Sequence, residues 1–342
     1  MIYFLKKLLS TYMMSTEKQA GRGRGVSTQS IPTTQENNST TQSPTYIPES
    51  NCVPIVNNNE KCVRYKSYRL GYIETDTYVY TGQLNDGYPY GYGIYYCKKS
   101  NTRYIGFFSN NILQSTEIQC PIIQYPNGNQ YKGNVNDKLR NGEGTIFSDK
   151  NKILFEGKFI DNKKNGLGKS FYKDGNLRTE GMYKNDKLNG FATQYYEDGT
   201  KRCEGEYVDD ELNGKGISYF SNGLKQYEGE FKKHKFYGKG VGYYINGNLR
   251  YDGYFEDNLI FGSETKIYYS NGKLMYSGSI NKNHMPDGKC TMYNIDGKII
   301  YKGEWKDGVR HGKGTSFNED DSIAYCGEWI DDKPCNKKQR IS

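Results

Sequence analysis

The residues of this chain that could support acid–base, nucleophilic or metal chemistry are few and far apart. The three histidines, His234, His284 and His311, have no second histidine or cysteine nearby at the spacing of a metal site. The sequence contains no H-E-x-x-H motif and no nucleophile elbow. The spacing of these residues therefore argues against hydrolytic and metal-dependent catalysis.

Acidic pairs and glycine-rich stretches also invite a chemical interpretation, but their spacing does not support one. Asp209-Asp210 and Asp320-Asp321 fall in predicted loops, where nothing gathers the several oxygens that a Ca²⁺ site or an acid–base pair needs. Gly168-Lys169-Ser170 resembles the end of a phosphate-binding loop, but Lys163 stands where such a loop requires its first glycine. We therefore expect no enzymatic activity and no cofactor or bound metal.

The composition indicates what kind of scaffold must position the remaining residues. Of the 342 residues, 34 are Tyr, 14 Phe and 2 Trp, and 40 are Gly, so aliphatic residues are too few for an ordinary Leu/Val/Ile core. Helix bundles and doubly wound α/β domains need long aliphatic faces, and Gly and Tyr are not strong helix formers. The chain is therefore all-β and rich in turns, or disordered.

The positive charge is concentrated near the N-terminus. Residues 1–70 carry nine Lys/Arg and four Asp/Glu, which leaves 38 − 35 = +3 of the total +8 for residues 71–342. This near balance argues against nucleic acid as a partner of the body of the protein. No apolar run approaches the roughly 18 to 20 residues that a membrane-spanning helix needs.

The first 70 residues differ from the rest of the chain. Residues 1–20 begin with MIYFLKKLLSTYMM, an acid-poor amphipathic stretch that is consistent with a mitochondrial targeting segment or with a short tail of no specific role. Residues 21–70 are mostly Ser, Thr, Gln, Asn and Pro, which cannot bury enough apolar surface to fold. We expect a disordered low-complexity tail there.

An aromatic-x-Gly motif recurs along most of the chain, usually every 24 residues. A G-x-G pair such as Gly238/Gly240 follows each motif, although Ala192, Glu264 and Cys290 replace the second glycine in three repeats. Asp-Gly or Asn-Gly pairs separate the repeats and favour two-residue type I′ hairpin turns. The motif predicts structural glycines at Gly133, Gly157, Gly181, Gly205, Gly229, Gly253, Gly278, Gly303 and Gly327.

Within each repeat the residues alternate as they do in a β-strand. In Tyr227-Glu228-Gly229-Glu230-Phe231 the aromatic residues and the glycine share one face and the charged residues share the other. Each glycine leaves a gap in which a neighbouring ring can pack. We therefore predict an elongated meander of about eleven β-hairpins over residues 71–332, followed by a basic tail, 333–342. Because the second repeat lacks its G-x-G pair, we expect an irregularity near residues 110–125.

The Y-x-G-x-[FYW] motif followed by G-x-G at this period resembles the MORN (membrane occupation and recognition nexus) repeat, over about residues 78–332. The resemblance implies a β-hairpin solenoid whose groove is lined by aromatic side chains and holds a helix or an extended segment of a partner protein, or serves in dimerisation. It also implies scaffolding in cytoskeletal, ciliary or membrane-associated assemblies, and for some members phosphoinositide binding. The groove aromatics in this chain would be Phe159, Tyr183, Tyr207, Phe231, Phe255, Trp305 and Trp329.

The function that follows is a non-catalytic scaffold or adaptor in the cytoplasm, associated with the cytoskeleton or a cilium. One alternative is an adaptor for anionic, phosphoinositide-containing membranes, and a second is an accessory subunit of a mitochondrial complex, if residues 1–14 are a presequence. A homodimer through the C-terminal repeats stays open, because the last strand presents an edge. The expected lipid contacts are Lys163, Lys164, Lys232, Lys233 and Lys235.

Overall fold

A computed structural model of the chain describes residues 69–116 and 119–335, which form one antiparallel sheet of 24 strands. The described residues include no helix, and so none that could cross a membrane. The predicted segment 1–20, nearly all of 21–70 and most of 333–342 lie outside the described residues. The strands are β1 (Arg69–Glu74), β2 (Tyr78–Asn85), β3 (Tyr88–Cys97), β4 (Thr102–Ser109), β5 (Ile112–Gln114), β6 (Ile122–Gln124), β7 (Gln130–Asn136), β8 (Leu139–Phe147), β9 (Ile153–Ile160), β10 (Lys163–Phe171), β11 (Leu177–Lys184), β12 (Lys187–Tyr195), β13 (Lys201–Val208), β14 (Glu211–Tyr219), β15 (Lys225–Lys232), β16 (Lys235–Tyr243), β17 (Leu249–Glu256), β18 (Leu259–Tyr268), β19 (Leu274–Ile280), β20 (Pro286–Tyr293), β21 (Ile299–Lys306), β22 (Val309–Phe317), β23 (Ile323–Ile330) and β24 (Lys333–Pro334).

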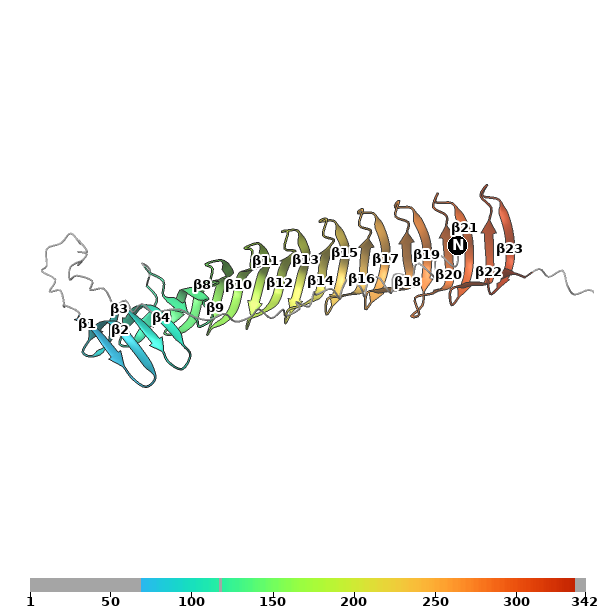
Figure 1. Ribbon diagram of the computed structural model, residues 1–342. Coiled ribbons are helices and arrows are strands. Elements are labelled where there is room, and N and C mark those ends of the chain that lie inside the picture. Colours follow the sequence, from blue (N-terminus) through green and yellow to red (C-terminus); the bar gives the residue numbers. More distant parts are fainter. Residues whose placement is uncertain (1–68, 117–118, 336–342) are drawn as a thin grey trace, which may run out of the picture. The chain divides into compact units, whose positions relative to one another are not determined.

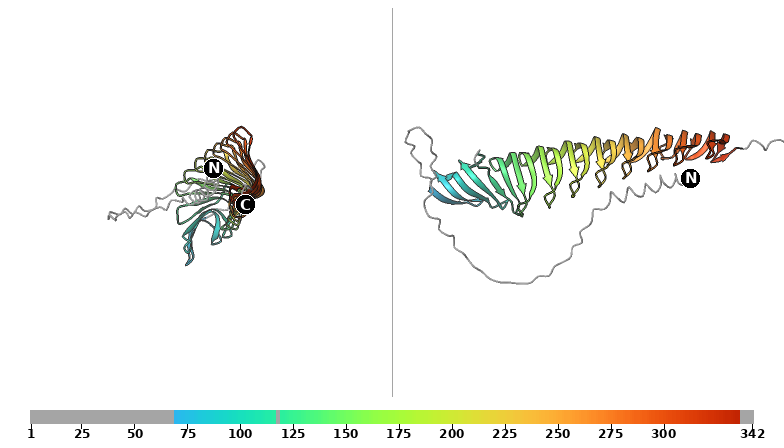
Figure 2. Two further views of the ribbon diagram at one scale, coloured as in Figure 1. Left: turned by 90° about the vertical axis from the view of Figure 1, so that its right-hand side faces the viewer. Right: turned by 90° about the horizontal axis from the view of Figure 1, so that it is seen from above.

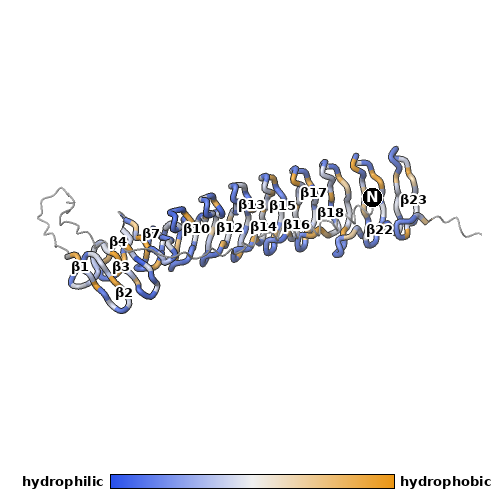
Figure 3. Tube along the Cα trace, in the orientation of Figure 1, coloured by the Kyte–Doolittle hydropathy of each residue, from blue (hydrophilic) through white to orange (hydrophobic). Residues whose placement is uncertain are grey.

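The strands follow one another across the sheet in the order of the chain (Figure 1). Each internal strand pairs antiparallel with the strand before it and the strand after it, except that β5 and β6 both pair with β4, so the sheet is a meander without crossovers. Seen end-on, successive hairpins rotate relative to one another, which is the twist expected of a β-sheet (Figure 2). Hydrophilic residues mark the turns along both edges (Figure 3). The predicted all-β hairpin-repeat fold is confirmed.

The expected irregularity near residues 110–125 is a split strand. Both β5 and β6 pair with β4, β5 along one part of it and β6 along another, and residues 115–121 run between them. The Ser115 hydroxyl donates to the backbone carbonyl of Val135 at 3.1 Å and accepts the Val135 N–H at 2.7 Å. One serine side chain thus replaces part of the missing strand ladder.

The glycines of neighbouring strands lie opposite one another and form a continuous row, which we call the glycine row. Gly133 pairs with Gly144, and Gly144 pairs with Gly157. A Cβ atom on Gly144 would lie 2.3 Å from ring atoms of Tyr131, so the ring fills the space that a side chain would take. All nine predicted structural glycines lie in this row. The same ring-on-glycine contact recurs for Tyr80 on Gly93, Phe155 on Gly168, Tyr227 on Gly240 and Tyr301 on Gly314.

The replaced glycines behave differently from one another. Ala192 and Cys290 lie in the glycine row as expected, opposite Gly205 and Gly303. The third position was predicted wrongly, because Thr265 and not Glu264 pairs with Gly278. The extra residue is accommodated by the register shift between Gly262 and Thr265, which turns the Glu264 side chain away from the row.

The prediction of type I′ turns at the Asp-Gly and Asn-Gly pairs is wrong. In the turn after β10, only Gly175 has a positive φ, and its N–H donates to the Tyr172 carbonyl at 3.0 Å. The Asp174 carboxylate accepts the Asn176 N–H at 3.0 Å and so favours a right-handed conformation at Asp174. These are three-residue loops with the glycine in the left-handed position. They lie side by side at one end of the strands, and we call this side of the sheet the long-turn edge.

The two-residue turns with positive φ at both positions lie at the opposite edge, within the repeats. Asp209 and Asp210 form one of them, with φ of 50° and 72°. The second residue also caps the preceding repeat, because the Asp210 carboxylate accepts the Leu188 N–H at 2.7 Å. Equivalent bonds from the previous repeat reach Asn162, Asp186, Asn258 and Asp332. The acidic and amide pairs are therefore turn formers that link consecutive repeats.

Candidate partner-binding surface

The sheet has one aromatic face and one polar face. In β21 the side chains of Tyr301 and Trp305 are buried on the aromatic face, while Lys302 and Glu304 lie on the polar face. This separation follows from the two-residue period of a strand. The two faces offer different contacts to a partner.

The predicted groove aromatics do not line an open groove. None of the seven rings is more than 5% exposed, so they form the core of the aromatic face and present no contact surface. Rings cover one another edge to face, as Phe159 does with Tyr131 of the preceding repeat and with Phe155 of its own strand, both at a centroid distance of 5.3 Å. The family resemblance implied an open groove, but these rings are enclosed by the side chains around them. The residues concerned are Phe159, Tyr183, Tyr207, Phe231, Phe255, Trp305 and Trp329.

Side chains that follow the two-residue turns add to this cover. The Arg310 guanidinium lies 4.0 Å from the centroid of the Trp329 ring, and Arg140 lies 4.9 Å from that of Phe159. Leu188 and Leu212 occupy the equivalent position in central repeats and are buried. Cationic and apolar side chains thus serve the same packing role at one repeat position.

Of the five predicted lipid contacts, Lys164 packs against a buried ring and the other four lysines are exposed to solvent. Lys164 is half-buried, with its ammonium 4.4 Å from the Phe155 ring centroid, and burial lowers the pKa of this lysine. Lys232, Lys233 and Lys235 are exposed, but Lys235 forms an ion pair with Asp257 at 3.2 Å. Lys163 is exposed as well. Contact of these lysines with anionic lipid stays a prediction.

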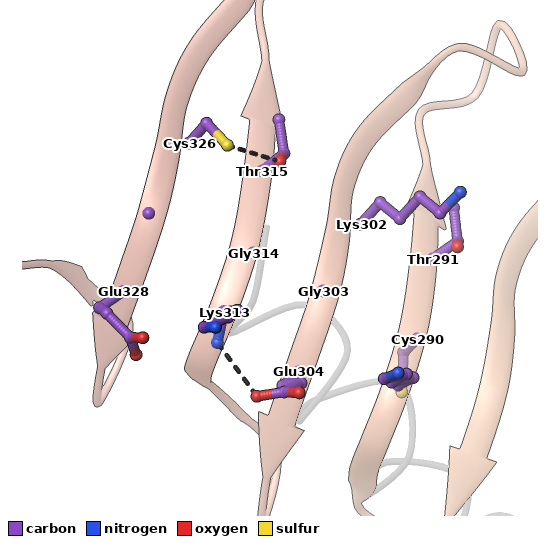
Figure 4. A pocket seen from close by; sticks show the side chains of 12 residues that line it. Cys290, Thr291, Lys302, Gly303, Glu304, Lys313, Gly314, Thr315, Cys326 and Glu328 are labelled. Carbon is purple, nitrogen blue, oxygen red and sulfur yellow. Dashed lines mark hydrogen bonds between the residues drawn. The ribbon is translucent and has the colours of Figure 1, made fainter.

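The polar face carries two rows of side chains on either side of the glycine row. In the last repeats, Thr291 and Lys302 belong to one row and Glu304 and Lys313 to the other (Figure 4). Between them lies a shallow hollow of about 600 Å³, lined in part by Gly303 and its neighbours in the glycine row. The positions of the glycine row add no side chain to this hollow, because a Cβ atom on Gly314 would point to the aromatic face, against the Tyr301 ring.

One of these rows is built mainly of cross-strand charge pairs, which we call the charged row. Lys215 lies opposite Glu230 and Lys313 opposite Glu328. The pattern is interrupted on β10–β12 by Leu167, Met182 and Phe191, which we call the central apolar patch. Leu167 pairs directly with Met182, and the three side chains are 69%, 39% and 60% exposed. Exposed apolar residues that cluster in this way mark interaction surfaces.

The sequence does carry a signal for this patch, although the predictions above miss it. Leu167 and Phe191 are the middle residues of G-x-G pairs, a position that holds Lys or Glu in most other repeats. An apolar residue between two glycines, on the polar face where most repeats carry a charge, indicates a contact site. A second group of exposed apolar residues, which includes Leu70 and Tyr72, lies near the first strand of the sheet.

The described residues show no metal-binding cluster, and their histidines take part in turns. They contain no group of three or more His, Cys, Asp or Glu side chains placed to hold a metal ion. The histidines serve the turns, where the Nδ1 of His234 accepts the Leu212 N–H at 3.4 Å and the Nδ1 of His284 lies 3.0 Å from the Ile260 carbonyl oxygen. Their positions follow the repeat period and do not converge.

The meander, the glycine row and the interlocked rings define a single-sheet β-hairpin repeat protein. The model of the MORN repeat matches residues 80–102, 131–152, 180–201, 203–225, 227–249, 301–317 and 325–337, and that of a MORN repeat variant matches 164–185 and 263–282. Together they cover more than half of the chain, which therefore belongs to the MORN-repeat family. Proteins of this family are typically non-catalytic interaction modules. No curated protein matches the chain.

Proposed function

We propose that this protein is a non-catalytic scaffold that binds a partner protein on the polar face of its sheet, with the central apolar patch as the anchor. The observation that carries the proposal is the exposure of Leu167, Met182 and Phe191, three apolar side chains on consecutive strands whose flanking neighbours in the same row, Lys158 and Glu206, are charged. A cluster of one aromatic and two flexible apolar side chains, surrounded by charges, has the composition of a binding hot spot. The aromatic face has no comparable exposed rings in the described repeats.

The form of the surface favours an extended partner segment. The glycine row and its flanking rows run across many strands. An extended segment laid along them would contact the central apolar patch and the charge pairs on either side of it. Lys158 and Glu206 lie next to the patch and would contribute to selectivity through opposite charges. The protein would then hold its partner at a fixed place along the array.

The test compares proteins that co-purify from native cells with the wild-type chain and with two single variants. Phe191→Lys alters the central apolar patch, whereas Ile245→Lys introduces the same charge at an equally exposed apolar residue of the long-turn edge. We expect a partner that is retained by wild type and by Ile245→Lys and is lost with Phe191→Lys. If both variants retain the same proteins as wild type, the patch is not the anchor.

The cellular setting is a further part of the proposal. Family resemblance supports a cytoplasmic, cytoskeletal or ciliary scaffold, and a mitochondrial role depends on residues 1–14, outside the described residues. An adaptor role at anionic membranes has less support, because Glu256 and Asp257 lie beside Lys232 and Lys235 in the same shallow pocket. Imaging of the tagged chain with and without residues 1–14 distinguishes these settings.

A further inference from the structure

Among the described residues, the first strand of the sheet is paired along one side only. Strand β1 pairs with β2 in continuous register from Arg69 to Glu74, and among the described residues no strand pairs with its other side. Edge strands of soluble proteins are usually protected by lysine, proline or a bulge. β1 contains no Lys or Pro, and its pairing with β2 shows no register shift.

Near this edge the polar face carries several exposed apolar side chains. Leu70 and Tyr72 project from β1 and are 83% and 61% exposed. On β2 the register places Gln83 beside Leu70 and Thr81 beside Tyr72. Beyond β2, Ile94 lies in line with Thr81, and Tyr92 and Phe107 pack edge to face at a centroid distance of 5.6 Å. We call Leu70, Tyr72, Tyr92, Ile94 and Phe107 the N-terminal apolar patch. Its most exposed members lie on the edge strand itself.

The other end of the sheet differs in both respects. The short strand β24 covers Trp329 and Ile330 of β23, and Pro334 lies in it. The Cys335 N–H donates to the Glu328 carbonyl at 2.8 Å and extends this cover. On the polar face of β23, Cys326 and Glu328 stand on either side of the glycine row, and the exposed Ile330 belongs to the stretch that β24 pairs with. The C-terminal edge therefore fits a second copy of the chain less well than the N-terminal edge does.

We propose that the protein forms a two-fold symmetric dimer in which β1 pairs antiparallel with β1 of a second copy. The glycine row fixes the register, because Gly71 pairs with Gly82 and is the first glycine of that row. With Gly71 opposite Gly71 of the second copy, the row continues across the axis. Leu70 of each copy then lies opposite Tyr72 of the other copy, and the N-terminal apolar patches of the two copies join on one face. This inference is independent of the proposed function.

The occupant is a second copy rather than an unrelated strand because the edge is self-complementary. The exposed apolar residues of β1 on the polar face are Leu70 and Tyr72, which stand at equal distances on either side of Gly71, and the exposed Glu74 lies beyond Tyr72. An axis at Gly71 therefore matches each apolar side chain with another one. A head-to-tail contact with β23 would instead place them against Cys326 and Glu328.

The first experiment measures the mass of the full chain by sedimentation over a range of concentrations. We expect a concentration-dependent species of twice the 39.3 kDa chain mass. The double variant Leu70→Lys, Tyr72→Lys should weaken association at least tenfold, because it places like charges in opposed positions. The matched control, Leu167→Lys with Phe191→Lys, introduces the same charges in the central apolar patch and should associate as wild type does. Circular dichroism and thermal melting of each variant establish that it is folded.

The second experiment tests the register by cysteine cross-linking. The double variant Leu70→Cys, Tyr72→Cys should form a reducible covalent dimer under mild oxidation, whereas Tyr72→Cys alone and wild type should not. A monomer at all concentrations, or an unchanged dimer in the lysine variant, would overturn the proposal. Strong cross-linking of Tyr72→Cys alone would overturn the register with Gly71 on the axis.

Discussion

At the scale of single residues, the glycines of the second half of each repeat do two different jobs. In β16, Gly238 has φ of 58° at a register shift, a left-handed conformation that other residues adopt only with strain. Gly240, two residues later, has no such requirement but lies under the Tyr227 ring. The motif G-x-G therefore combines a backbone requirement at its first glycine with a packing requirement under a buried ring at its second.

Substituting Gly240 by Ala should destabilise the protein by about 2 to 4 kcal/mol, because a Cβ atom there would lie 2.1 Å from the Tyr227 hydroxyl oxygen in a filled site. Gly242 is the matched control on the same strand, since its Cβ would lie 3.4 Å from the nearest atom, Cδ2 of Tyr251. Gly242→Ala should cost less than about 1 kcal/mol. Chemical denaturation measures both. Equal losses would show that the ring contact is not the cause.

Buried tyrosines should make the fold sensitive to alkaline pH. Burial raises the pKa of Tyr301 to about 12, from an ordinary value near 10.0. Above pH 10 the unfolded chain loses this proton and the folded chain keeps it, so the stabilising effect is complete below pH 10 and is lost as the pH rises through 12. We expect the melting temperature to fall over that range, and to fall less for Tyr301→Phe. An identical pH dependence in that variant would contradict this assignment.

At the scale of the hairpin, one repeat lacks both the ring and the glycine on which that ring packs, which we call its seat. Where most repeats carry Tyr or Phe two residues before the first glycine, β11 carries Thr179, and the residue in the seat is Ala192 instead of glycine. The Thr179 hydroxyl lies 2.5 Å from that of Tyr183 and 2.5 Å from that of Ser170, so hydrogen bonds replace the missing ring. A shallow polar pocket of about 380 Å³ lies beside it.

This pairing predicts a strong coupling between two substitutions. Thr179→Tyr alone should destabilise the protein by about 1 to 3 kcal/mol, because Ala192 fills the seat that the new ring needs. Ala192→Gly alone leaves a small gap. The double variant should recover most of the loss, which gives a coupling energy of about 1 kcal/mol or more in a double-mutant cycle. Additive effects of the two substitutions would rule out the pairing of ring and seat.

The two-residue turns allow a stabilising substitution. His234 holds the capping position with a weak 3.4 Å contact, while Asn258 accepts the corresponding N–H, that of Phe236, at 2.8 Å. His234 has φ of 64°, a conformation that Asn tolerates well. We expect His234→Asn to stabilise the protein by about 0.5 to 1 kcal/mol in denaturation. Asp210→Ala, which removes the equivalent cap one repeat earlier, should have the opposite effect.

At the scale of the whole array, the strands hydrogen-bond to adjacent strands and their rings reach no further than the next repeat, so stability is a sum of local terms. The weakest link in the described sheet is the split strand, because β6 pairs with β4 and with β7 through three residues each. We expect hydrogen exchange to divide the sheet there, with β1–β4 opening independently of the repeats from β7 onward. Uniform protection through residues 102–136 would contradict this division.

Sequence periodicity predicted most of this architecture because the fold is local. The glycine spacing determines the register of each hairpin, and alternation within Tyr227–Phe231 assigns the two faces. The low exposure of the rings could not be predicted from the sequence, because it depends on how tightly adjacent hairpins close around Phe159 and its equivalents. The turn types did not follow either, because the Asp174 side chain decides between two loops that both accept glycine.

The meander has a mechanical consequence. Hydrogen bonds between antiparallel strands run perpendicular to the strands, so tension between the first and last strands pulls along these bonds and breaks them pair by pair. Each repeat of about 24 residues occupies about 10 Å of the sheet and releases about 80 Å of extended chain when it is peeled away. Single-molecule pulling should therefore record a series of small, equal steps at low force. A tether of this kind lengthens under load long before it breaks.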